Sequence, residues 1–203
     1  MDTKKLQKKE AKRQNILEAA IRVFARHGFH NTSVSQVARE AGVADGTIYL
    51  YFANKNELLI SIFEDAMSFF IDQATEALHN LETAPQKLRT LAHLHLKNLG
   101  ENEDIATILQ VELRHSIRIM KQFSETTLRT YLKLMEEIII MGQKEGSIRE
   151  EYNPWILVKV FFGALDEMTT NWILRKRDYQ LEEMVDPVLD ILLDGFAPCE
   201  AHR

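Results

Sequence analysis

Apolar residues of this chain recur at intervals of three and four positions, the spacing that brings side chains onto one face of an α-helix. In the clearest example, Ile16, Ala20, Val23 and Phe24 lie at positions i, i+4, i+7 and i+8. The sequence contains no stretch with the apolar–polar alternation of a strand and no repeat of fixed period. Only 8 Gly and 4 Pro interrupt its 203 residues. We therefore predict an all-α fold.

Cysteine content and hydropathy exclude several classes of protein. The one cysteine, Cys199, allows neither an internal disulfide nor a zinc site built from cysteines. The most apolar stretch, residues 155–165, contains Lys159 and is much shorter than the ~18–20 residues that span a bilayer. No apolar segment follows the charged N-terminus, as it would in a signal peptide. We expect a cytoplasmic protein without a membrane partner, a bound metal or a cofactor.

The net charge of −5 is distributed unevenly along the chain. Residues 1–58 contain ten Lys or Arg and six Asp or Glu, a net charge of +4, whereas residues 59–203 contain fifteen and twenty-four, a net charge of −9. This contrast predicts two domains, residues 1–58 and residues 59–203. The first thirteen residues form a basic arm, which includes Lys4 and Lys5 and matters if a nucleic-acid module follows.

The segment after Gly28 has the pattern of a helix-turn-helix module. Ser33 and Gln36 form a capping box that opens a short helix through residue 41, and Gly42 makes a tight turn. A second short helix is expected over residues 45–52, before a long helix from residue 54 towards residue 78. A helix over residues 11–27 precedes the module. Two short helices joined by a glycine-containing turn are typical of a DNA-binding domain.

Residues 32–43, 46–52 and 55–59 resemble the DNA-binding domain of the TetR family of bacterial regulators in order, spacing and aromatic positions. The resemblance covers about residues 11–60. It implies an all-helical homodimer in which the helix-turn-helix domain binds DNA and a C-terminal helical domain binds ligand and dimerises. It also implies repression of transcription, relieved by a small ligand, and no enzymatic activity.

The residue types in this module suit DNA contacts. Gly46 lets the helix start approach the bases, Thr47 can pair with a base edge or touch a thymine methyl, and Asp45 either reads a cytosine amine or favours the helix N-terminus. Tyrosine and lysine side chains reach phosphates, and hydroxyls at a helix start add further contacts. Two recognition helices of a dimer, about 34–36 Å apart, would read a palindromic double-stranded operator. The DNA-binding candidates are Lys4, Lys5, Thr32, Ser33, Asp45, Gly46, Thr47, Tyr49, Leu50, Tyr51 and Lys55.

The acidic remainder is predicted to consist of helices over residues 85–99, 104–114, 123–144, 154–175 and 181–196. Gly100 is expected to end the first of them, and Pro187 either kinks the last one or marks a later start. The last two helices carry more apolar residues than one face can hold, so another subunit or a ligand must cover part of them. The resemblance implies that they form the dimer interface.

Residues 44–52, 110–116 and 162–167, with Trp172, resemble the acyl-CoA-responsive repressors of fatty-acid degradation within this family. That resemblance implies an apolar channel for a long acyl chain, with basic groups at its mouth for the coenzyme phosphates, and a long-chain acyl-CoA as effector. His93 and His95, two apart on one helix, are interpreted as structural. The ligand-binding candidates are Gln110, Arg114, Arg118, Phe162, Asp166 and Trp172.

Two other functions remain open at this point. A multidrug-responsive regulator would bind aromatic cations beside Asp166 or Glu167. More remotely, the Glu-x-x-His spacing at residues 76–79 and 112–115 is that of di-iron helix-bundle oxidases, which need two further inward glutamates. An oxidase would have no need of the N-terminal module, so the regulator is the favoured hypothesis.

Overall fold

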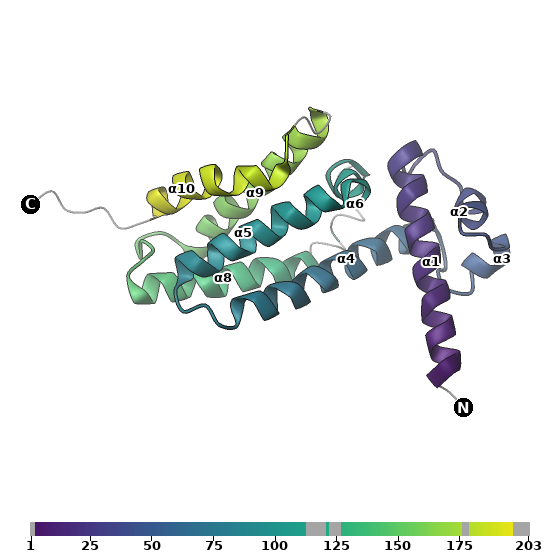
Figure 1. The fold of residues 1–203 in the computed structure, drawn as a ribbon, viewed down its shortest axis with the longest axis horizontal. Helices are drawn as coiled ribbons and strands as arrows, with labels where there is room; N and C mark the ends of the chain where they lie inside the picture. Colours follow the sequence, from purple (N-terminus) through teal and green to yellow (C-terminus); the bar gives the residue numbers. More distant parts are fainter. Residues whose placement is uncertain (1–2, 113–120, 122–126, 176–178, 197–203) are drawn as a thin grey trace, which may run out of the picture. The chain divides into compact units, whose positions relative to one another are not determined.

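The computed structural model describes residues 3–112, 121, 127–175 and 179–196, and within these ranges all regular structure is helical (Figure 1). The predicted all-α class is confirmed. The elements in chain order are α1 (Thr3–His27), α2 (Val34–Glu40), α3 (Asp45–Ile48), α4 (Lys55–Leu78), α5 (Ala84–Glu101), α6 (Glu103–Thr107), the π-helical turn η1 (Ile108–Glu112), α8 (Thr127–Glu145), α9 (Pro154–Leu174), the 3₁₀ turn η3 (Leu181–Met184) and α10 (Val185–Phe196).

The described residues fall into two compact units. The first lies within Met1–Ala66 and Thr107–Phe123, and the second within Met67–Ala106 and Ser124–Arg203. Helix α4 contributes its N-terminal half to the first unit and its C-terminal half to the second. The domain boundary expected from charge, after residue 58, lies earlier in the same helix.

The core of the first unit is the apolar face of α1 packed against α2. Ile16, Ala20 and Phe24 have no exposed surface, as the helical spacing predicts. Val37 and Ala38 on α2 are equally buried. These side chains anchor the short helices to α1, because α2 and α3 are too short to be stable alone.

Helix α1 begins at Thr3, eight residues before the predicted start at residue 11. The basic arm is therefore helical, since Lys4 and Lys5 lie in the first turns of α1. Lysine, glutamine, glutamate and alanine all favour the helix, and neither glycine nor proline precedes Gly28. The apolar pattern could not show this start because residues 4–13 are almost all solvent-exposed.

The turn between the two short helices follows the predicted chemistry. Ser33 caps α2 and forms the capping box with Gln36, and Gly42 has a φ of +66°, which only glycine adopts without strain. Helix α3 spans only Asp45–Ile48, and the remainder of the predicted helix, residues 49–51, is a turn. The backbone N–H of Leu50 donates to the carbonyl of Thr47, three residues back, which tightens the chain there.

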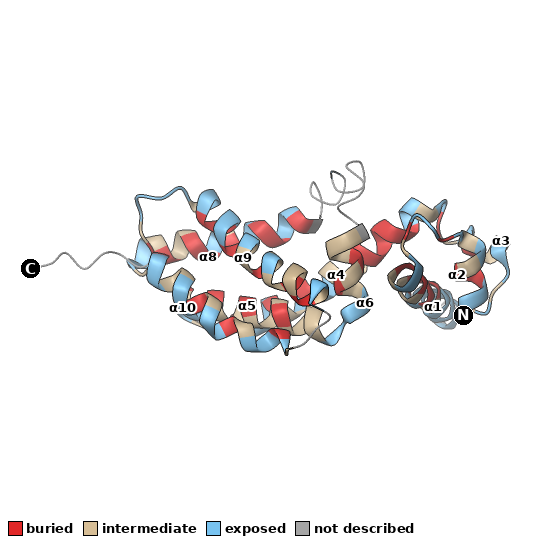
Figure 2. Cartoon of the chain, turned by 90° about the horizontal axis from the view of Figure 1, so that it is seen from above, coloured by how far each residue is buried: buried red, intermediate tan, exposed pale blue. Residues whose placement is uncertain are grey.

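Helix α5 is central to the second unit, where it packs against α8, α9, α10 and η3 (Figure 1). Pro85 lies in its first turn as expected, and Thr83 and Gln86 form a capping box that the sequence analysis did not predict. Contrary to the prediction, Gly100 does not end the helix, which runs to Glu101. A Cβ at residue 100 would lie 3.4 Å from the Cβ of Leu181, an ordinary van der Waals contact, so packing against η3 does not require glycine here. Buried and exposed residues alternate along α5 and α8 (Figure 2).

The last two helices start where the sequence indicates. The side chain of Asn153 accepts a hydrogen bond from the N–H of Trp155, and Pro154 occupies the first turn of α9. Pro187 lies in the first turn of α10, which confirms the later start of the two possibilities, because a proline there breaks no intrahelical hydrogen bond. No helix in the described part of the chain is both long and apolar enough to cross a membrane.

Candidate functional site

The turn that begins at α3 presents a group of exposed side chains in the first unit. Tyr49 and Leu50 are 56% and 77% exposed, while Ile48 and Phe52 beside them are buried. The buried pair holds the turn against the core, so the exposed pair is displayed on a rigid support. A Cβ at Gly46 would meet no atom within 4 Å. Nothing within the described chain therefore requires glycine at residue 46, which is consistent with a surface kept clear for a partner.

Asp45, at the start of α3, accepts a hydrogen bond from the hydroxyl of Ser35 on α2. This contact joins the two short helices at the point where α3 begins. Of the two roles left open for Asp45, the position in the first helical turn favours stabilisation of the helix N-terminus. Thr47, two residues further along α3, is half-buried, and Tyr51 is half-buried as well.

The two hydroxyl candidates before α2 both make internal hydrogen bonds. Thr32 is 4% exposed, and its hydroxyl donates to the carbonyl of Gly28 at 2.8 Å. The hydroxyl donates to the chain's own backbone, so a direct contact of this group with DNA would have to replace that hydrogen bond. Ser33 is exposed, but its hydroxyl forms the N-cap of α2 through Gln36.

Lys55 has a structural role that its sequence position did not predict. Its Nζ donates to the carbonyl oxygens of Phe29 and Thr32, both at 2.7 Å, and lies 4.4 Å from the centre of the Phe29 ring. These contacts fasten the start of α4 to the loop between α1 and α2. Any phosphate contact of Lys55 must share the ammonium group with these two carbonyls.

Basic side chains line the first turns of α1. Lys5, Lys8, Lys9 and Lys12 are spaced by three or four residues, which places them on one helical face, and all are exposed. The positive charge expected of an arm is thus carried on a helix, which can follow a phosphate backbone but cannot enter a minor groove as an extended chain.

In the second unit, four helices each contribute one ring to a buried group that we call the aromatic cluster: Phe70 of α4, His95 of α5, Tyr131 of α8 and Phe162 of α9. The phenol oxygen of Tyr131 lies 2.9 Å from Nδ1 of His95, and the two rings stack at 5.7 Å. Phe70 meets the Tyr131 ring edge-on at 4.9 Å, and Phe162 lies 6.1 Å from both His95 and Tyr131.

The electrostatics of the aromatic cluster are set by burial. Burial lowers the pKa of His95 from 6.5 to about 4, and the nearby carboxylate of Asp166 opposes this shift without cancelling it. Burial also raises the pKa of Tyr131 well above 10. Both side chains are therefore uncharged near neutral pH. The helices thus bring two predicted ligand residues, Phe162 and Asp166, close to the neutral pair of His95 and Tyr131. Of this pair, His95 was expected to be structural and Tyr131 was not predicted at all.

The other predicted ligand residues lie elsewhere. Trp172 is 3% exposed, and its indole N–H donates to the carbonyl of Tyr179 at 2.7 Å, which holds the chain after α9. This hydrogen bond is internal to the chain, and a contact of the Trp172 ring with a ligand stays a prediction. Gln110 is half-buried in η1, within the first unit. Arg114 and Arg118 lie outside the described residues.

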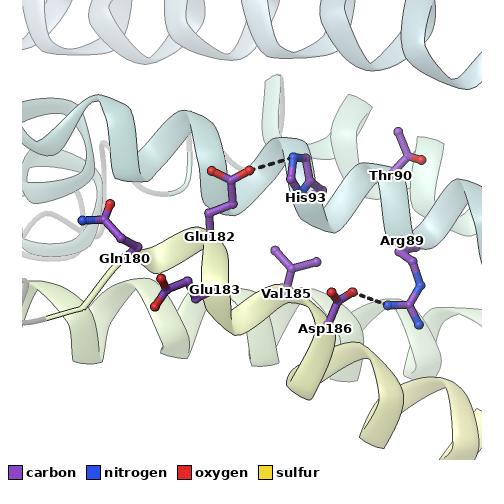
Figure 3. Close-up of a pocket in the computed structure, with 8 residues that line it drawn as sticks. All are labelled: Arg89, Thr90, His93, Gln180, Glu182, Glu183, Val185 and Asp186. Atoms are coloured by element: carbon purple, nitrogen blue, oxygen red, sulfur yellow. Dashed lines mark hydrogen bonds and ion pairs between the residues drawn. The ribbon is translucent and has the colours of Figure 1, made fainter.

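A surface groove of about 560 Å³ runs between α5 and the η3–α10 segment (Figure 3). Nε2 of His93 lies 2.9 Å from Glu182, and the guanidinium of Arg89 pairs with Asp186 and with Asp190. Charged side chains dominate the lining of this groove, so the groove does not suit an acyl chain. The ion pairs instead fasten η3 and α10 to α5.

The residues of the di-iron alternative are not assembled in the described part of the chain. There, no three His, Cys, Asp or Glu side chains lie close enough together to hold a metal ion. His79 lies at the end of α4, hydrogen-bonded to Asn80, and His115 is outside the described residues.

Comparison with known proteins identifies both halves of the chain. Residues 16–62 match the family model of bacterial regulatory proteins, tetR family, and residues 63–195 match the C-terminal region of YsiA-like proteins. The fatty acid metabolism regulator protein of Bacillus subtilis (strain 168) is 35% identical over 190 residues, which cover 94% of this chain and 98% of that protein.

Solved structures agree with this assignment. The fatty acid degradation regulator FadR from Bacillus halodurans has a TM-score of 0.88 and 38% identity, covering 91% of this chain and 95% of the other. The transcriptional regulator FadR from Bacillus subtilis, in complex with stearoyl-CoA, has a TM-score of 0.87 and 35% identity, covering 90% and 98%. The chain described here is therefore a member of the tetR family of bacterial regulatory proteins.

Proposed function

We propose that this chain represses fatty-acid degradation genes and leaves its operator when it binds a long-chain acyl-CoA. The observation that carries the proposal is the similarity, over 90% of the chain, to a regulator whose structure holds stearoyl-CoA. The aromatic cluster supports it, because the apolar rings of Phe70 and Phe162 beside the uncharged His95–Tyr131 pair suit the hydrocarbon tail of such an effector. The acyl-CoA is then an effector ligand rather than a cofactor.

The DNA-binding surface of this proposal is the exposed turn of the first unit. Tyr49 and Leu50 project from it, Gly46 leaves room for a base pair, and the lysines of α1 supply positive charge. Positive charge on the first unit and negative charge on the remainder would orient the protein on a duplex. Binding should therefore weaken steeply as the salt concentration rises.

A homodimer completes the proposal, since two recognition turns are needed to read a palindromic site. Helices α9 and α10 expose large apolar side chains: Ile156 is 58%, Val160 is 46% and Ile191 is 75% exposed. Apolar surface of this kind is typical of an interface. Ile156→Asp should yield a monomer by light scattering, whereas Phe69→Asp, at an equally exposed apolar position on α4, should leave the dimer intact.

Release from DNA requires that the effector bind more tightly to a form whose recognition turns are wrongly spaced. Helix α4 is the covalent link through which such a change would travel, because it belongs to both compact units. The protein would act in the cytoplasm, where the operator DNA is.

Calorimetry with acyl-CoAs of increasing chain length, with and without operator DNA, tests the proposal. We expect long-chain acyl-CoAs to bind the free protein more tightly than the protein on its operator, by linkage. If no acyl-CoA binds, while an aromatic cation binds and releases DNA, the multidrug-responsive alternative replaces this proposal.

A further inference from the structure

The hydrogen bond between His95 and Tyr131 uses only one of the two polar hydrogens of the pair. A neutral imidazole has one N–H and a phenol has one O–H. If the phenol donates to Nδ1, the N–H at Nε2 remains, and if Nδ1 donates, the phenol O–H remains. In either tautomer, one donor of the pair has no hydrogen-bond acceptor among residues 3–112, 121, 127–175 and 179–196.

An unpaired donor at this position is costly. Tyr131 is 1% exposed and His95 is half-buried, so the open donor is a buried O–H in one tautomer and an N–H on a half-buried ring in the other. Buried polar groups in folded proteins almost always have a partner, and a donor left without one costs free energy comparable to its desolvation. A hydrophobic pair of similar volume would avoid this cost. The open donor is therefore available to an acceptor from outside the described chain.

The surroundings select the chemistry of that acceptor. Phe70 and Phe162 flank the pair, so the acceptor must be attached to a hydrocarbon group. His95 is half-buried, which leaves some of its surface within reach of a ligand. The negative charge of Asp166, which acts on His95, would repel a carboxylate. A neutral oxygen between two apolar parts of a ligand fits these conditions, and the carbonyl of a thioester is such an oxygen.

On the basis of the proposed function, we propose that His95 and Tyr131 form the polar anchor of the effector site and donate their open hydrogen to the thioester carbonyl of the acyl-CoA. The anchor fixes where the acyl chain begins within the helices. It also distinguishes an acyl thioester from a free fatty acid, whose carboxylate Asp166 disfavours. His95 and Tyr131 would then determine which ligand binds, in addition to packing between the helices.

The test compares stearoyl-CoA with S-octadecyl-CoA, a thioether that lacks only the carbonyl oxygen. In calorimetry with the full chain, we expect the thioester to bind about three- to tenfold more tightly, the range of one net hydrogen bond. The double variant His95→Phe/Tyr131→Phe should bind both probes within about twofold of each other. The matched control His79→Phe/Tyr152→Phe, at two positions outside the aromatic cluster, should keep the wild-type ratio.

Operator binding without effector, measured for each variant, reports whether the double variant is folded. Equal affinity of the wild-type protein for the two probes would overturn the polar anchor, whatever the variants do. An unchanged preference for the thioester in a folded double variant would overturn it as well. If the wild-type protein binds neither probe, the proposed function itself fails, and the two failures are thereby distinguished.

Discussion

Arg13 of α1 and Asp65 of α4 form a two-pronged ion pair within the first unit. The guanidinium donates to both carboxylate oxygens, at 2.7 and 2.9 Å, and lies 5.8 Å from the centre of the Phe52 ring. The pair thus joins α1, α4 and Phe52, which follows the exposed turn after α3. We predict that it stabilises the first unit and that operator affinity depends on it.

The size of the effect follows from geometry and exposure. Two charge-assisted hydrogen bonds in a buried site would contribute several kcal/mol, but the side chains here are 27% and 35% exposed. Solvent screening reduces the coupling to about 1 kcal/mol, the upper end for exposed pairs. For a chain of this length, that corresponds to about 2–4 °C in melting temperature. The pair also holds the pKa of Arg13 above its ordinary value, so the guanidinium stays charged at every accessible pH.

A double-mutant cycle measures this coupling. Arg13→Gln, Asp65→Asn and the double variant are unfolded in urea, and the free energies of unfolding are compared. Arg22 and Glu40 form a control pair with a single 2.8 Å contact and should give a smaller coupling. If the effects of the two Arg13–Asp65 substitutions simply add, the pair contributes nothing and the reasoning is refuted.

Three further predictions concern single positions. Burial lowers the pKa of His95 to about 4, so as pH falls the imidazole is protonated in the unfolded chain before it is protonated in the folded one. The free energy of unfolding should therefore decrease by up to about 3 kcal/mol between pH 6.5 and 4. The same decrease in His95→Phe would contradict this prediction. Lys55→Met should lower the free energy of urea unfolding by about 1–3 kcal/mol, since two carbonyls lose their donor, and wild-type stability would argue against that role. Tyr49→Phe and Leu50→Ala should leave stability within about 0.5 kcal/mol yet weaken operator binding in fluorescence anisotropy; unchanged binding would remove these residues from the interface.

The local signals of the sequence predicted the first unit well. The capping box of Ser33 and Gln36 and the turn at Gly42 depend on neighbouring residues, so their structure could be derived without tertiary contacts. The start of α1 was missed because a fully exposed helical turn leaves no apolar pattern. The continuation of α5 through Gly100 was missed because this glycine was interpreted as a helix stop, although its φ is not positive.

The candidate effector site was only partly predictable. Phe162 and Asp166 were identified through a resemblance, but their neighbours were not. His95 lies on the face of α5 that also carries Leu88 and Leu91, and this apolar surrounding was the available signal that it is partly buried. Its partner Tyr131 is 36 residues away on another helix, and no spacing rule within one helix relates the two.

The central claim is that a long-chain acyl-CoA releases this protein from its operator. The most direct measurement is fluorescence anisotropy of a labelled duplex, selected from random-sequence DNA by the protein itself, during titration with stearoyl-CoA. We expect the anisotropy to fall to the value of free DNA at saturating stearoyl-CoA, and coenzyme A alone to have no effect. Saturation with stearoyl-CoA, verified by calorimetry, without any loss of DNA binding would contradict the account.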